Sequence, residues 1–151
     1  MKRAVPALAV SSAAVFATVA LAAGPNAAGT RVTAVLNARQ EVPPQAVKVR
    51  SASGSFSGTL VQTRRGYRLS WRITFENLSG KARFAHVHRG RPGIHGPALI
   101  FLCGPCVSGA HGSAYVSPPE ARLILERRTY VTIRTKRNPA GEIRGQISKS
   151  G

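Results

Sequence analysis

Acidic residues are scarce in this sequence of 151 residues. There is no aspartate at all, and the acidic side chains are five glutamates: Glu41, Glu76, Glu120, Glu126 and Glu142. Calcium sites rich in carboxylates and mechanisms that use paired aspartates are therefore excluded by composition. A Ser-His-Asp triad is excluded for the same reason, and a glutamate variant of it would have few candidates.

Cysteine is also rare, with Cys103 and Cys106 as the only two in the chain. Their Cys-Gly-Pro-Cys spacing is that of a thioredoxin-like redox motif, in which a helix stabilises the reactive thiolate. Residues 107–113 are rich in glycine and serine and cannot form a stable helix there. We therefore expect a disulfide that closes a tight loop. A zinc site that shares the two thiolates with a nearby histidine is the alternative.

The N-terminus has the three-part layout of a secretory signal peptide. Lys2 and Arg3 precede an uncharged apolar run at residues 4–23, which ends in the small-x-small sequence of residues 20–22. A transmembrane anchor is the alternative, but the run is rich in alanine and no basic cluster follows it. No later segment approaches the length of a membrane span. We expect a secreted, extracellular protein without a transmembrane anchor, made of a signal peptide (1–23), a short disordered leader (24–30) and one domain (31–149).

Positive charge dominates the composition. The chain has 22 lysines and arginines, and 20 remain against the five glutamates once Lys2 and Arg3 are removed, a net formal charge of +15. Such an excess attracts anions, so the expected partner is an anionic extracellular polymer or protein. No nucleic-acid-binding motif accompanies the charge, so sequence-specific nucleic-acid binding is not expected. The alternative is a solvated surface that reflects an arginine-rich composition. The expected basic surface consists of Arg68, Arg72, Arg122, Arg127, Arg128, Arg134, Lys136 and Arg137.

Short apolar segments broken by glycine, proline and serine predict a mostly β structure. The clearest pattern is at residues 67–75, where apolar and polar residues alternate strictly. Ser117 and Glu120 have the spacing of a capping box, so a short helix is expected to begin there. The fold class is therefore all-β: an antiparallel Greek-key-like β-sandwich with one short helix. The predicted strands are residues 31–38, 51–62, 67–75, 82–88, 97–102, 111–116, 127–135 and 142–148.

Three segments together resemble the CHRD (chordin) domain family: residues 34–44, 85–97 and 130–147. They occur in the family's order and cover nearly the whole expected domain. The resemblance implies a secreted β-sandwich module with a binding or structural role rather than an enzymatic one. It assigns the family motif to Glu41, Pro43, His86, His88, Gly96, Pro97, Gly141, Glu142, Arg144 and Gly145.

His86 and His88 are the residues of the motif best suited to a metal. Two residues apart on a strand, both imidazoles face the same side, which would suit half of a zinc or copper site. The strand also resembles the copper-ligand strand of copper/zinc superoxide dismutases, so a metal-binding redox protein is the alternative function. His95 and His111 could complete such a site. CHRD sequences commonly have a further histidine where this chain has Arg134, and a guanidinium cannot donate a lone pair. We therefore expect no cofactor, with copper or zinc as the alternative.

Overall fold

The computed structural model describes residues 28–151, so the predicted signal peptide lies outside the described residues. This part of the chain forms nine strands, one short 3-10 helix and one α-helix. In chain order they are β1 (Thr30–Asn37), η1 (Ala38–Gln40), β2 (Ser53–Thr63), β3 (Gly66–Glu76), β4 (Ala82–Arg89), β5 (Ala98–Cys103), β6 (His111–Val116), α1 (Pro118–Leu125), β7 (Thr129–Thr135), β8 (Ile143–Gln146) and β9 (Ser148–Lys149).

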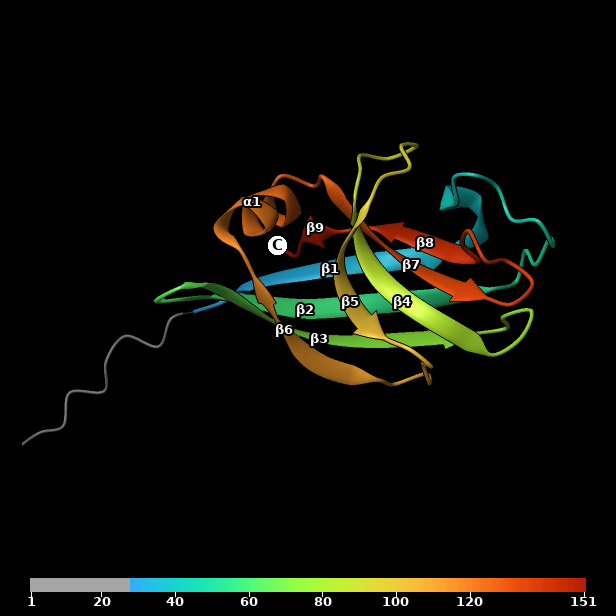
Figure 1. Ribbon diagram of the computed structural model, residues 1–151, viewed down its shortest axis with the longest axis horizontal. Coiled ribbons are helices and arrows are strands. Elements are labelled where there is room, and N and C mark those ends of the chain that lie inside the picture. The colour runs from blue at the N-terminus through green and yellow to red at the C-terminus, as the bar shows by residue number, and fades with distance from the viewer. Residues whose placement is uncertain (1–27) are drawn as a thin grey trace, which may run out of the picture.

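All strand pairs are antiparallel and belong to one sheet, in the order β5-β4-β7-β8-β1-β2-β3-β6, with β9 beside β1. The end strands β5 and β6 contact each other, so the sheet curls back on itself. The result has two layers (Figure 1), which we call the β3 layer (β1, β2, β3, β6) and the β4 layer (β4, β5, β7, β8). The connection from β6 through α1 returns the chain to β7 beside β4, which is a Greek-key arrangement. The predicted antiparallel all-β fold is confirmed, and β8 and β1 join its two layers into a single sheet.

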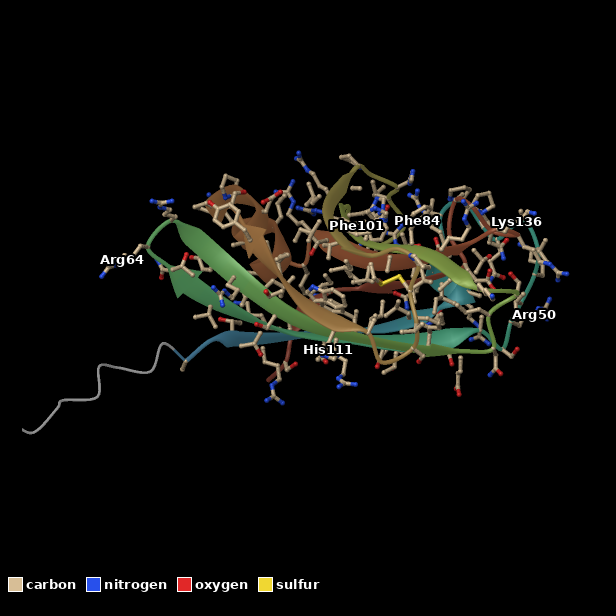
Figure 2. All side chains as sticks on the ribbon, turned by 60° about the horizontal axis from the view of Figure 1, so that its bottom comes forward. Arg50, Arg64, Phe84, Phe101, His111 and Lys136 are labelled. Carbon is tan, nitrogen blue, oxygen red and sulfur yellow. A yellow bond between two sulfur atoms is a disulfide. The ribbon has the colours of Figure 1, made fainter. Side chains whose placement is uncertain are left out.

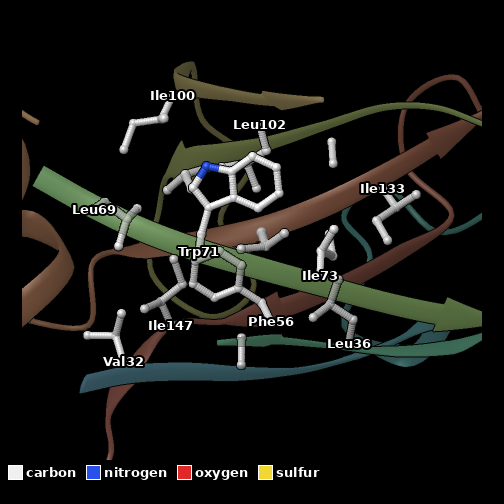
Figure 3. Packing of buried hydrophobic residues seen from close by; sticks show 14 of the residues in the cluster. Val32, Leu36, Phe56, Leu69, Trp71, Ile73, Ile100, Leu102, Ile133 and Ile147 are labelled. Carbon is white, nitrogen blue, oxygen red and sulfur yellow. The ribbon is translucent and has the colours of Figure 1, made fainter. Parts of the chain in front are cut away.

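The core lies between the two layers, as the strand alternation predicts. On β3, Leu69, Trp71 and Ile73 are buried, whereas Arg68 and Arg72 are exposed. Figure 3 shows Trp71 and its neighbours packed among apolar side chains from both layers. Most polar side chains of the strands therefore lie on the outward faces of the two layers, although Phe84 and Phe101 are exposed on the β4 layer.

The predicted capping box of α1 is confirmed. The Ser117 side chain accepts from the Glu120 backbone, and the Glu120 carboxylate accepts from the Ser117 N–H. At the other end, the N–H groups of Arg127 and Arg128 donate to carbonyls of α1, and Arg127 adopts a left-handed conformation (φ 59°). The strand predicted from residue 127 therefore begins only at Thr129.

Two further predictions concern the cysteines and the membrane. Cys103 and Cys106 form a disulfide at the end of β5, as predicted. Within residues 28–151, no helix combines the length and the apolar character that a membrane crossing requires.

Candidate functional site: a clamped loop and its basic cleft

His86, His88 and Arg144 of the family motif lie on the outward face of the β4 layer. His86 and His88 both point to this face, with ring centroids 5.8 Å apart, as the period-two spacing predicts. The antiparallel register places His88 opposite Tyr130 on β7. The same face continues onto β8, where Arg144 lies opposite Thr132. Residues from three strands therefore form one contiguous polar surface.

His88 is buried and fully engaged by protein groups. Its Nδ1 lies 2.8 Å from the Gly96 carbonyl oxygen, and its Nε2 lies 3.5 Å from Nη2 of Arg134. This pairing assigns the proton to Nδ1, which donates to Gly96, and leaves Nε2 to accept from the guanidinium. Burial lowers the pKa of His88 to about 4, with a further contribution from Arg134, so the imidazole is neutral near pH 7. Burial, and then Arg134, also lowers the pKa of His86.

The structure brings together only part of the predicted metal set. His95 lies near His88, with ring centroids 6.3 Å apart, whereas His111 lies on β6 in the other layer. Between residues 28 and 151 there is no group of three or more His, Cys, Asp or Glu side chains placed to hold a metal ion. In the same part of the chain, no observation favours the superoxide-dismutase-like alternative.

The buried polar side chains hold the loop of residues 90–97, which we call the clamped loop. Nη2 of Arg144 donates to the carbonyls of Arg91 and Ile94, each at 3.0 Å. His88 donates to the Gly96 carbonyl, and the Tyr130 hydroxyl accepts from the Gly96 N–H at 3.2 Å. The three side chains are also packed together. The Arg144 guanidinium lies 3.4 Å from the centroid of the Tyr130 ring, on which His88 stacks at 5.1 Å.

Glu41 is the acidic member of this polar surface. It is buried and accepts a 2.6 Å hydrogen bond from the Thr132 hydroxyl. Burial raises the pKa of Glu41 to about 7, although the charges of Arg144 and Arg134 act in the opposite direction. The carboxyl group lies against Gly141, where a Cβ atom would be only 2.2 Å from Oε2. The glycine of the motif is therefore required by the close approach of Glu41.

Glu142 has a structural role in the turn between β7 and β8. Its carboxylate accepts from the Ser79 N–H and hydroxyl, the Thr135 hydroxyl and the Asn138 amide. Although burial acts to raise the pKa of Glu142, these hydrogen bonds hold it below its ordinary value. Asn138 also donates to the Val47 carbonyl at 3.0 Å and accepts from the Val47 N–H at 2.8 Å. This part of the motif ties three surface segments together.

A basic cleft of about 360 Å³ lies beside the clamped loop. Its charged and titratable lining consists of Arg89, Arg91, His95 and Arg128, with no carboxylate among the lining residues. The Gln146 amide joins the cleft's two sides, since it donates to the carbonyls of Gly90 and Arg127, each at 2.9 Å. The buried clamp thus fixes the wall of an exposed, positively charged concavity.

The predicted basic surface is divided by the fold. Arg127 and Arg128 lie at the end of α1, next to the cleft, and Arg122 pairs with Glu126 at 2.8 Å. Arg134 contacts His88, and the remaining members lie elsewhere: Lys136 and Arg137 in the turn after β7, and Arg68 and Arg72 on the β3 layer. Sequence reasoning missed Arg89 and Arg91, which line the cleft. The available signal was their position on either side of Gly90, directly after the His-x-His strand.

Comparison with known proteins identifies the domain. The family model described as CHRD domain matches residues 32–147, which is most of the chain. Comparisons with curated proteins and with solved structures gave no match.

Proposed function

The chain belongs to the CHRD domain family, and from this premise we propose that it is an exported, non-enzymatic binding module for an anionic extracellular partner, which it captures in the basic cleft. The main support for the proposal is the way in which buried side chains hold the clamped loop. Arg144, His88 and Tyr130 are all buried, and each forms at least one hydrogen bond with the backbone of an exposed loop. Such support preorganises a binding surface and reduces the entropy lost when a ligand is bound.

The uneven distribution of the five glutamates also supports an anionic partner. Glu41 and Glu142 are buried, and Glu120 closes the capping box of α1. Among the described residues, both ion pairs involve Glu126, which contacts Arg122 and Arg128. The surface arginines therefore have few carboxylates near them, and an anion can approach the cleft without displacing an internal salt bridge at Arg89 or Arg91.

The test is binding of dextran sulfate by the secreted protein, measured by calorimetry with neutral dextran as the ligand control. Replacing Arg89 and Arg91 with alanine removes two charge-assisted contacts and should weaken binding roughly tenfold or more. The matched control, Lys136→Ala with Arg137→Ala, removes the same charge outside the cleft and should change the affinity less than about twofold. Equal losses in the two variants, or an affinity that is flat with salt concentration, would exclude the cleft as the site.

A second variant separates loop geometry from charge. Arg144→Lys keeps the positive charge but cannot bridge the carbonyls of Arg91 and Ile94 with one planar group. The clamped loop should loosen, so the Gly96 amide should exchange its hydrogen faster while the salt dependence of binding stays the same. Unchanged exchange at Gly96 would show that the guanidinium does not hold the loop.

A further inference from the structure

The outward face of the β3 layer is the second large basic surface of the molecule. Its side chains are mostly hydroxyls and guanidiniums, and we call it the arginine face. The residues that define it are Arg31, Ser57, Thr59, Arg68, Ser70 and Arg72. All lie on strands whose other face contributes to the core, so the arginine face is a rigid part of the sheet rather than a loop.

The strand register distributes the three arginines over the face. Arg31 lies opposite Thr59, which in turn lies opposite Ser70. The next cross-strand row places Ser57 opposite Arg72, and the row on the other side contains Arg68. Side chains on one face recur every two residues, so successive rows are about 7 Å apart along the strands. Two of these rows offer one positive charge beside small hydroxyl groups, whereas Arg68 lies between Val61 and Tyr115.

Two open depressions lie on this layer. Arg31 and Arg72 contribute to one of about 470 Å³, and Arg68 contributes with Arg64 and Arg65 to one of about 530 Å³. No carboxylate lines either depression. Because both ion pairs among the described residues involve Glu126, these guanidiniums are available to an external anion.

The arginine face and the basic cleft lie on opposite sides of the core. Trp71, between Ser70 and Arg72 on β3, points into the core, so its two neighbours point away from the β4 layer. Figure 2 shows the same separation, with His111 of the β3 layer on the lower side and Phe84 and Phe101 of the β4 layer on the upper side. One ligand chain on each surface would therefore not collide with the other.

We propose that the arginine face is a second binding surface, for an extended anionic polysaccharide, and that the two surfaces together let one molecule bridge two polymer chains. The charges complement sulfate or carboxylate groups, and the serine and threonine hydroxyls between them match the hydroxyls of sugar rings. A surface that binds single-stranded nucleic acid usually offers several exposed aromatic side chains on which bases stack. Here the exposed aromatic residue is Tyr115, opposite Arg68, so a polysaccharide fits the face better than a nucleic acid. The bridging activity rests on the proposed function of the cleft, whereas binding at the arginine face does not.

The experiment counts the chains of short dextran sulfate bound per protein by calorimetry, and follows bridging of long dextran sulfate by light scattering. The face variant combines Arg31→Ser, Arg68→Ser and Arg72→Ser, which match the serines already present on the face. The control variant removes the same charge from exposed residues that line neither surface: Arg83→Ser, Lys136→Ser and Arg137→Ser. Circular dichroism and thermal melting establish that both variants remain folded.

We expect the wild type and the control variant to bind two short chains, and the face variant to bind one and to lose bridging of the long polymer. The cleft variant with Arg89 and Arg91 changed to alanine should also bind one chain and fail to bridge. Equal stoichiometry and scattering in the face and control variants would overturn the arginine face as a site. If the cleft variant still binds two chains while the face variant binds one, the cleft fails and the arginine face stands. Binding of inorganic polyphosphate at the face as tight as that of dextran sulfate would refute the polysaccharide assignment.

Discussion

Two buried groups, Glu41 and His88, should give the domain opposite pH dependences that nearly cancel. Burial raises the pKa of Glu41 from 4.5 to about 7, so the folded state keeps a proton that the unfolded state releases. Glu41 therefore lowers the free energy of unfolding as the pH rises from about 4.5 to 7. Burial lowers the pKa of His88 from 6.5 to about 4, so the unfolded state takes up a proton first as the pH falls. His88 therefore lowers the free energy of unfolding as the pH falls from about 6.5 to 4.

The size of each effect follows from the shifts. The pKa of each group differs by roughly 2.5 between the unfolded and the folded state. At 1.36 kcal/mol for a pKa difference of one, each group changes the free energy of unfolding by about 3 kcal/mol over its full pH range. This is a large part of the 5–15 kcal/mol that typically stabilises a domain. Between pH 4.5 and 6.5 the two slopes have opposite signs, so these two groups should leave the wild-type stability nearly flat there.

Glu41→Gln removes one slope and keeps the hydrogen bond that Oε1 of Glu41 accepts from Thr132, because an amide oxygen also accepts. The stability of this variant relative to wild type should rise by about 3 kcal/mol between pH 4.5 and 7. Urea denaturation at several pH values measures the difference, which cancels the contributions of all other groups. Glu76→Gln, which removes an exposed carboxylate on β3, is the matched control. A Glu41→Gln variant that is less stable than wild type, and increasingly so toward pH 7, would refute the reasoning, since it would mean that Arg144 and Arg134 stabilise an ionised Glu41.

Three further predictions concern other parts of the chain. Arg127→Gly should raise the free energy of unfolding by about 1 kcal/mol in urea denaturation, because glycine adopts the left-handed conformation after α1 without the penalty of a Cβ atom; a loss of stability would contradict this. Elemental analysis of dialysed protein should find no stoichiometric metal, because Arg134 faces His88; about one copper or zinc per chain, lost when His86 and His88 are changed to alanine, would reverse this conclusion. Secreted protein should begin near residue 23, and N-terminal sequencing that finds an intact Met1 would disprove cleavage.

The sequence alone predicted the features that depend on neighbours along the chain. Strand alternation follows from the two-residue period of the β backbone, so the buried face of β3 and the shared face of His86 and His88 could be assigned without the structure. The capping box of α1 involves residues only three apart, and the disulfide joins cysteines with the same separation. The family resemblance is likewise a property of the residue order.

Only the tertiary structure decided what the polar motif residues do. Arg144 lies about fifty residues from the carbonyls that it binds, and Thr132 lies 91 residues from Glu41. Such contacts depend on which strands are neighbours, and the Greek-key path places β4, β7 and β8 side by side although they are separated in the sequence. For the same reason the residues of the expected basic surface are distributed over both layers. A charge pattern along the chain determines the total charge, whereas strand order determines which charges share a surface.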